Sequence, residues 1–302
     1  MSLMLFKIMI PVSFIVKLLQ EFNAIGYIGD ILSPFMKLVG LPGEMGLVWA
    51  TTLIANLYGG IIAFFSIYSS VPMTVAQMTV LCTMMLIAHT FPVELIVARK
   101  AGVKLIPMLF IRLGFAFILG IILNLIYTHG GFFQEKLVIG WKPASPPDPG
   151  LKYWIIDQLK NYGMIYIIIL SLITIIKLLT EFGLIKAMNR ILKPVMSLLG
   201  IGEKIIPISI IGLTLGVAYG GALIIKESKQ HPMSRRDVFY SFVLMGLCHS
   251  IFEDSILMIS LGGHYSGIII ARVLFAFLIT LLIVKLTSRF TDTQMYRYFL
   301  RK

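Results

Sequence analysis

Lys17-Leu-Leu-Gln-Glu21-Phe22 returns 160 residues later as Lys177-Leu-Leu-Thr-Glu181-Phe182. The same spacing recurs far along the chain and joins residues that are unusual in apolar sequence. The further pairs are His89 with His249, Glu94 with Asp254, Arg112 with Arg272, and Phe115-Ala-Phe117 with Phe275-Ala-Phe277. Tyr58-Gly-Gly and Tyr219-Gly-Gly match after a shift of one residue. Ordered matches of this kind predict two copies of one structural repeat.

The composition places the repeats in a membrane. The chain has 302 residues, of which 58% are hydrophobic and 13% charged, and its mean hydropathy is +0.92. A helix needs about 20 apolar residues to cross about 30 Å of hydrocarbon. Runs of this kind lie near 4–20, 74–98, 105–127, 162–180, 236–260 and 265–285. No small-residue cleavage site follows the first run, so we expect it to be a retained span.

The charge pattern predicts opposite orientations for the two copies. The net charge of +12 lies mainly in short loops and at the chain ends, which favours cytoplasmic loops over a nucleic-acid surface. Residues 21–44 hold three acids and one base, whereas the equivalent residues 181–204 hold two acids and four bases. Residues 99–104 are basic, whereas residues 262–264 carry no acid, lysine or arginine. Loops that are basic in one copy are thus neutral or acidic in the other, as in an inverted repeat.

These patterns predict an all-α polytopic membrane protein with both termini in the cytoplasm. We expect six crossings, two interfacial amphipathic helices at 24–40 and 184–200, and two re-entrant hairpins broken at the Tyr-Gly-Gly segments. The expected divisions are repeat 1 at 1–128, an external connecting loop at 129–155, repeat 2 at 156–286 and a basic tail at 287–302. Cys82 and Cys248 lie in apolar spans, so we expect no disulfide framework.

Several motifs of the second half carry a family resemblance. In order, they are Gly202-Glu203-Lys-Ile-Ile-Pro207, Gly212-Leu-Thr-Leu-Gly216, Tyr219-Gly-Gly-Ala222, Ser234-Arg-Arg236 and Cys248-His-Ser250. This order resembles the nucleoside-recognition, or Gate, domain family. That family includes the spore maturation membrane proteins and the pore region of the B-type ferrous-iron permeases, and it is related to the concentrative nucleoside transporters. The resemblance implies a bacterial cytoplasmic (inner) membrane protein in which two opposed hairpins meet beside a polar midplane cavity.

Charged residues within the spans mark the expected site, because each costs roughly 2.5–3.5 kcal/mol on insertion scales. His249, Ser250 and Glu253, with His89 in the first copy, form the expected cluster for a solute or a coupling cation, either a proton or sodium. Glu253 is the strongest candidate, because the first copy has Val93 in its place.

An alternative interpretation of the charges is internal neutralisation. Glu94 precedes Arg112, and Asp254 precedes Arg272, in equivalent positions of the two copies. Each arginine therefore has an acid with which it can form a buried ion pair.

The hairpins add a second set of expected solute ligands. Helix ends at a chain break present free amides and carbonyls to a ligand. The residues concerned are Asn56, Tyr58, Gly59, Gly60, Thr214, Tyr219, Gly220 and Gly221. The alternative is that the glycines only let helices pack closely.

Together these expectations favour a small-solute transporter that works by alternating access. A non-transport scaffold or accessory subunit of an envelope pathway and a divalent metal-ion permease stay open as alternatives. We expect no enzymatic activity, because adjacent His249 and Ser250 face different ways on a helix and lack the geometry of a nucleophile and its base. No cofactor, resident metal or nucleic-acid partner is expected, whereas the bilayer is a partner and homo-oligomerisation is possible.

The inverted orientation is testable in intact cells. We expect tags placed beside Lys100 and beside Arg235 to be shielded from an impermeant label, because both basic loops are predicted to be cytoplasmic. A tag in the 129–155 loop is the accessible control. Labelling of either basic loop from outside contradicts the inverted arrangement.

Overall fold

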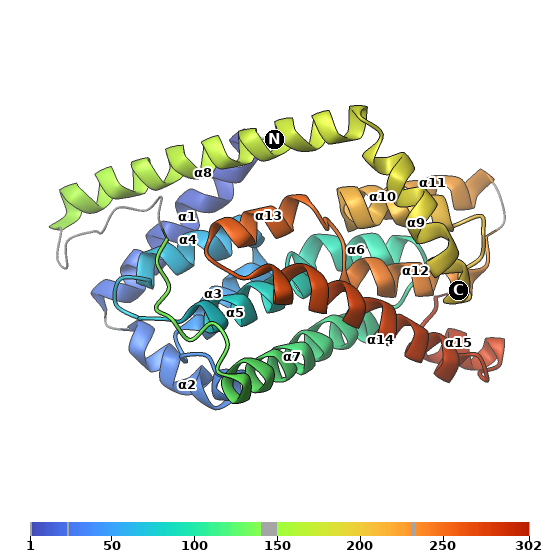
Figure 1. Cartoon of the computed structure of the whole chain (residues 1–302), viewed down its shortest axis with the longest axis horizontal. Helices are drawn as coiled ribbons and strands as arrows, with labels where there is room; N and C mark the ends of the chain where they lie inside the picture. Colours follow the sequence, from blue (N-terminus) through green and yellow to red (C-terminus); the bar gives the residue numbers. More distant parts are fainter. Residues whose placement is uncertain (1, 23, 140–149, 231–232, 302) are drawn as a thin grey trace.

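The computed structural model describes residues 2–22, 24–139, 150–230 and 233–301. Within these ranges the regular structure is helical, apart from two isolated β-bridges (Figure 1). The all-helical class expected from the sequence is therefore confirmed.

The helices follow one order twice. Those of the first half are α1 (Ser2–Glu21), α2 (Ala24–Leu38), α3 (Met45–Ile54), α4 (Leu57–Ile67), α5 (Val75–Ile87), α6 (Phe91–Lys100) and α7 (Leu105–Gly130). Those of the second half are α8 (Gly150–Glu181), α9 (Leu184–Leu198), α10 (Ile206–Leu215), α11 (Val217–Gln230), α12 (Arg235–Leu247), α13 (Glu253–Ser260), a π-helical turn η1 (Ser266–Ala271) and α14 (Arg272–Thr287). The helix α15 (Asp292–Tyr298) is the last helix of the described residues.

Several equivalent elements of the two halves lie at opposite ends of the long axis. Helix α2 and the α3–α4 pair occupy the left of Figure 1, whereas α9 and the α10–α11 pair occupy the right. Helices α2 and α9 each have 15 residues and carry a proline at the same position, Pro34 and Pro194. This placement accords with the inverted repeat, while the side of the membrane that each end faces stays a prediction.

Two pairs of short helices form the hairpins. Helix α3 packs against α4, and α10 packs against α11. Each arm has 10 to 14 residues, fewer than a crossing needs. The chain breaks at Ala55 and Asn56 in the first hairpin and at Gly216, with φ of 104°, in the second.

The position of these breaks corrects the sequence interpretation, which placed them at the Tyr-Gly-Gly segments. Both segments lie in the first turns of α4 and α11 instead. Their glycines are needed for packing: a Cβ on Gly60 would lie 1.8 Å from Thr52 Oγ1, and one on Gly220 would lie 2.6 Å from the Gly212 Cα. Glycine here permits close contact between the hairpin arms.

Two further breaks interrupt the central helices. The chain turns between α5 and α6 at Thr90, with φ of 51°, and between α12 and α13 at Ser250, with φ of 45°. These are equivalent positions, and the backbone of each residue is held in a left-handed conformation that non-glycine residues rarely adopt. Such conformations cost on the order of 1–3 kcal/mol each, and they persist only where the surrounding structure enforces them.

Three stretches are long and apolar enough to cross a membrane among the described residues. They are Val75–Lys100, Leu105–Gly130 and Ser266–Thr287. Helices α1 and α8 cover the expected runs 4–20 and 162–180, and α12 with α13 covers 236–260. Helix α8 begins at Gly150, inside the expected connecting loop 129–155, of which residues 140–149 lie outside the described part.

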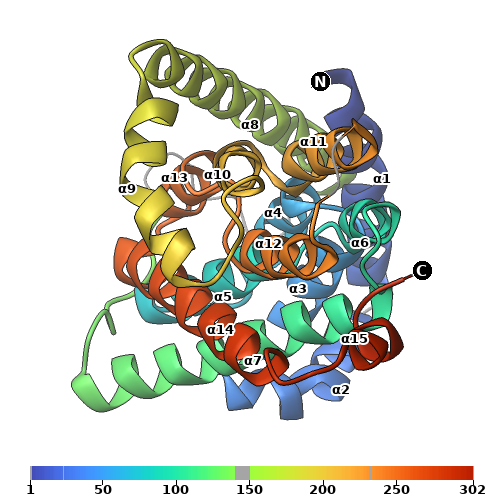
Figure 2. The ribbon, with the colours of Figure 1, turned by 90° about the vertical axis from the view of Figure 1, so that its right-hand side faces the viewer.

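Helices α5 and α12 run through the middle of the molecule (Figure 2). All ten residues from Val238 to Leu247 are buried. The long outer helices instead expose large apolar side chains, among them Phe110, Leu274 and Leu278. An apolar exterior of this kind suits contact with lipid.

The basic segments gather at one end. Arg235 Nη1 donates to the Ala101 carbonyl at 3.4 Å, and Arg236 Nη2 lies 2.8 Å from Asp292 Oδ1. The 287–302 segment, expected to be a tail, contains α15 and is docked: the Arg301 amide donates to the Gly102 carbonyl at 2.9 Å. Loops of both halves that were predicted to be cytoplasmic thus lie together.

The glycine contact predicts a sharp difference between two alanine variants. Gly220→Ala places a methyl group against the Gly212 backbone, so we expect a loss of roughly 1–3 kcal/mol of stability. Gly114→Ala, on the exposed face of α7 with nothing within 4 Å of the added Cβ, is the matched control. Thermal unfolding of both proteins in detergent measures the effect. Equal melting temperatures contradict the assigned packing role.

Candidate functional site

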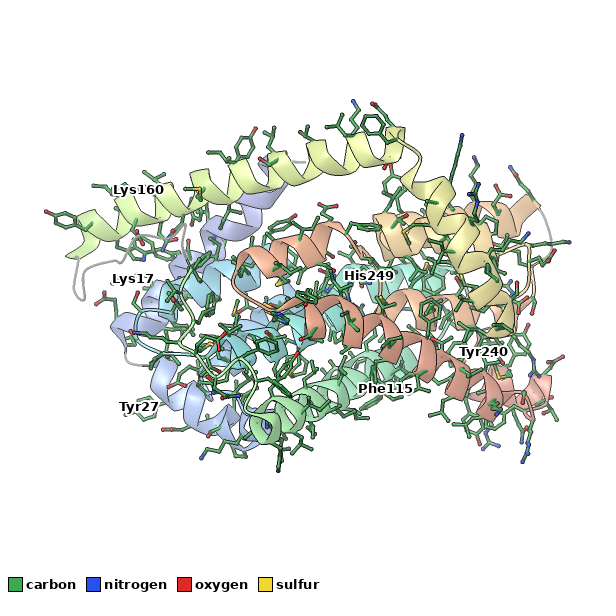
Figure 3. All side chains as sticks on the ribbon, viewed as in Figure 1. Lys17, Tyr27, Phe115, Lys160, Tyr240 and His249 are labelled. Atoms are coloured by element: carbon green, nitrogen blue, oxygen red, sulfur yellow. The ribbon has the colours of Figure 1, made fainter. Side chains whose placement is uncertain are left out.

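The four backbone breaks meet at one cavity of about 200 Å³. The two hairpins contribute residues near their breaks, and the loops after α5 and α12 contribute polar side chains. The lining residues are Asn56, Leu57, Tyr58, His89, Thr90, Leu215, Ser250, Glu253 and Asp254. His249, which adjoins this lining in the sequence, lies near the middle of the molecule, far from Tyr27 and Tyr240 toward its ends (Figure 3). The cavity is therefore built by both repeats.

His89 and His249 come together from equivalent positions. Their Nε2 atoms lie 3.0 Å apart, and both side chains are buried. Each Nδ1 bonds the backbone carbonyl four residues earlier, that of Met85 at 2.9 Å and that of Met245 at 2.8 Å. Each helix ends at its break, so the carbonyls of its last turn lack the usual amide partner, and the imidazole Nδ1 bonds one of them.

Each break is also tied to the neighbouring hairpin. The Thr90 amide donates to the Thr52 carbonyl of α3 at 3.0 Å, and the Ile251 amide donates to the Leu213 carbonyl of α10 at 3.1 Å. Asn56 caps α4 by accepting the Gly59 amide at 2.8 Å. Backbone groups released by the breaks thus find partners within the protein, as burial away from water requires.

Glu94 and Arg112 form a buried ion pair. Arg112 Nη1 lies 2.5 Å from Glu94 Oε2, and the guanidinium also donates to the carbonyls of Ile87 at 3.0 Å and His89 at 3.2 Å. The other carboxylate oxygen, Oε1, lies 3.2 Å from His249 Nε2 and 3.4 Å from His89 Nε2. This pair thus takes the form that the neutralisation interpretation expected for the first repeat.

The equivalent pair in the second repeat does not form, which corrects the expectation for Arg272 and Asp254. Arg272 is fully buried and donates through Nη2 to Ser255 Oγ at 3.0 Å. Its Nε and Nη1 have no hydrogen-bond acceptor in the described part of the chain. Asp254 instead lines the cavity beside Glu253. The two repeats therefore hold their acids in different arrangements.

The structure separates the expected hairpin ligands into two groups. Asn56 and Tyr58 line the cavity. Gly60, Gly220 and Gly221 lie against neighbouring helices. Thr214 Oγ1 bonds carbonyls of its own helix, and Tyr219 is 64% exposed.

The sequence did not predict two apolar residues of the cavity, Leu57 and Leu215. Nothing in the sequence distinguishes them from other leucines in apolar helices. The residues that bond the Nδ1 atoms of the two histidines could have been predicted from the repeat. Met85 and Met245 stand four residues before His89 and His249 and obey the same spacing of 160. Repeat matching extended to these positions predicts equivalent surroundings for the two rings.

In the comparisons with known proteins, one relative aligns with this chain over most of the length of both. Over 283 residues the chain is 30% identical to the uncharacterized membrane protein YvoD of Bacillus subtilis strain 168. The aligned part covers 92% of this chain and 88% of the relative.

The chain belongs to the YvoD family. Its membrane class is therefore established by the relative together with the apolar helices. No protein-family model and no solved structure matches the chain. The Gate resemblance thus stays a prediction for this member of the YvoD family.

The buried Glu94–Arg112 ion pair of this chain predicts a large effect of its removal on stability. Glu94→Ala leaves the Arg112 charge buried and uncompensated, so we expect a loss of about 3–5 kcal/mol. Glu21→Ala breaks the Lys17–Glu21 pair, in which the glutamate side chain is 62% exposed, and is the matched control. Exposed pairs of that kind contribute at most about 1 kcal/mol. Equal unfolding temperatures of the two variants in detergent contradict the structural role given to Glu94.

Proposed function

We propose that this YvoD-family protein carries a small solute across the bacterial cytoplasmic membrane by alternating access, with both termini in the cytoplasm. The observation that carries the proposal is the cavity where both repeats contribute chain breaks and polar side chains. Broken helices at membrane depth are tolerated where they are buried in protein or line a wet cavity. Transporters built from repeats bind solute at such breaks near the bilayer midplane.

The difference between the two repeats also supports alternating access. In the first repeat Glu94 is held by Arg112, whereas in the second Asp254 faces the cavity and Arg272 binds Ser255. Two copies of one sequence pattern thus adopt two local arrangements. Movement of Arg272 from Ser255 to Asp254, together with release of Glu94 by Arg112, is one way to move access from one side of the membrane to the other.

Glu253 and Asp254 are the proposed coupling or solute-binding carboxylates. Both line the cavity, and Glu253 has no counterpart in the first repeat. A carboxylate within a membrane span is a functional-site hypothesis by default, because its insertion is unfavourable. Coupling to a proton or to sodium belongs to the proposal, whereas enzymatic activity does not.

The competing function is a non-transport scaffold that uses the same fold to bind an envelope protein. A scaffold has no need of a polar cavity between its repeats, and its midplane is expected to be packed. The cavity lined by Asn56, Tyr58 and the two acids therefore favours transport.

Water access to the cavity tests the proposal. We expect Tyr58→Cys and Glu253→Cys to react with a charged, membrane-impermeant methanethiosulfonate reagent, because both positions line the cavity. Leu278→Cys, on the apolar exterior of α14, is the lipid-facing control, and the wild type is the blank because Cys82 and Cys248 are buried. Protection of both cavity cysteines in folded protein favours the scaffold.

A solute screen carries the test further. We expect one compound among nucleosides and organic anions to raise the melting temperature of the purified wild type, since a ligand that binds the folded state stabilises it. Glu253→Gln and Asp254→Asn are expected to remove that shift and the uptake of the same compound into proteoliposomes. Unchanged uptake in both variants excludes these acids from the mechanism.

A further inference from the structure

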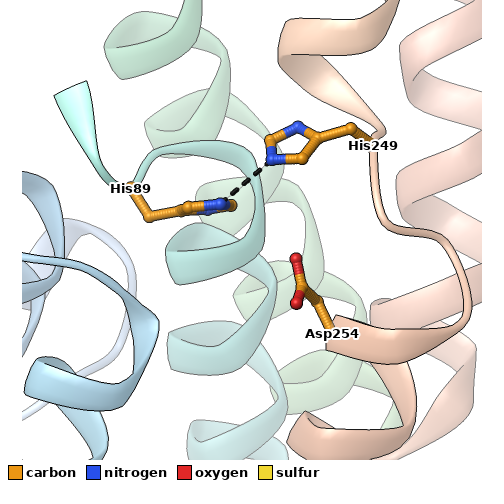
Figure 4. Close-up of side chains that lie close together, drawn as sticks. All are labelled: His89, His249 and Asp254. Atoms are coloured by element: carbon orange, nitrogen blue, oxygen red, sulfur yellow. Dashed lines mark hydrogen bonds between the residues drawn. The ribbon is translucent and has the colours of Figure 1, made fainter. Parts of the chain in front are cut away.

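Four side chains beside the cavity converge from both repeats. His89, His249 and Asp254 each offer a ligand atom within 4.8 Å of the others (Figure 4). Glu94 adds its Oε1 oxygen, which lies within 3.4 Å of both imidazole Nε2 atoms. All four side chains are buried.

The hydrogen bonds of the imidazole rings determine which nitrogen faces the centre of this cluster. A backbone carbonyl can only accept, so the Nδ1 atoms bonded to the carbonyls of Met85 and Met245 must carry the hydrogen. In a neutral ring the Nε2 atom is then a bare acceptor. Two Nε2 lone pairs and a carboxylate oxygen thus face one another, and only a positively charged species between them relieves this arrangement.

The spacing of these acceptors matches the coordination shell of a metal ion. Zinc binds imidazole nitrogen at about 2.0–2.1 Å, so tetrahedral ligands lie roughly 3.3 Å apart. The three observed separations are 3.0 Å between the Nε2 atoms and 3.2 and 3.4 Å from these atoms to Glu94 Oε1. Asp254 offers a carboxylate oxygen within 4.8 Å of a nitrogen of each histidine, and it is the available fourth ligand.

We infer that His89 Nε2, His249 Nε2, Glu94 Oε1 and the Asp254 carboxylate form a binding site for one divalent transition-metal ion of the zinc class. Imidazole nitrogen suits Zn²⁺, Cu²⁺, Fe²⁺ and Ni²⁺, whereas Mg²⁺ and Ca²⁺ require oxygen ligands. The inference concerns binding and holds whether or not the chain transports a solute.

The surroundings are those of a prepared metal site. Each histidine donates its outer N–H to a backbone carbonyl, which fixes the ring and directs Nε2 inward. Arg112 holds the other oxygen of Glu94 and so orients the ligating one. Glu253 and Asp254 bring negative charge to the same cavity. The ion joins the break after α5 to the break after α12, and therefore one repeat to the other.

Metal titration of the purified full-length protein tests the site. After removal of bound metal with a chelator, we expect one equivalent of Co²⁺ to produce the visible absorption of four-coordinate cobalt, and Zn²⁺ to displace it. Elemental analysis after dialysis should give one zinc per chain. Zn²⁺ should raise the melting temperature, and Mg²⁺ should not.

Histidine variants localise the ion. We expect His89→Gln and His249→Gln to weaken Zn²⁺ binding by more than about 100-fold, since loss of even an outer hydrogen-bond partner costs about 10–100-fold. His129→Gln removes an exposed histidine at the end of α7 and is the matched control. The cobalt spectrum of the wild type supplies a readout that does not depend on the folding of any variant.

Two results overturn the inference. The first is wild-type protein that retains no zinc and gives no four-coordinate cobalt spectrum, in which case a shared proton occupies the cluster. The second is Zn²⁺ binding by folded His89→Gln and His249→Gln that equals the binding of the His129→Gln control.

Discussion

A backbone amide or carbonyl inside a bilayer must have a partner in the protein, and this requirement shapes the centre of the molecule. Every departure from helix at membrane depth releases such groups. In this structure the four breaks lie together, and groups at one break form hydrogen bonds with the neighbouring hairpin. The backbone carbonyls of Thr52 and Leu213 accept amide hydrogens from the loops after α5 and α12. The Arg112 guanidinium donates to the backbone carbonyls of Ile87 and His89. A break displaced from this centre would leave its polar groups facing lipid.

The repeat was readable because it rests on residues that apolar sequence rarely contains. The spacing of 160 residues placed His89 opposite His249 and related Glu94 to Asp254, and the structure gathers all four. Charge was informative for the same reason: basic loops separated by more than a hundred residues were assigned to one side, and Arg235 does contact the loop at Ala101. Rare polar residues thus carry most of the information in such a chain.

Other features could not be read from the pattern, since they depend on packing. Glycine was interpreted as a break, yet Gly60 and Gly220 lie in helices and allow close approach to Thr52 and Gly212, while Asn56 and Gly216 form the breaks. The second ion pair was expected from the repeat, but the two copies differ in sequence beside the arginine. Arg272 binds Ser255, whose counterpart in the first repeat is Leu95 and offers no such acceptor.

The docked C-terminal segment has a consequence for biosynthesis. The Lys104 amide and the Gly102 carbonyl belong to the first half, but their partners are the Phe299 carbonyl and the Arg301 amide. These partners leave the ribosome only after the second repeat has been translated. The Lys104 amide and the Gly102 carbonyl must therefore have other partners, such as water, while the second half is made, and the contact between the two halves at this end forms after α15 has been translated.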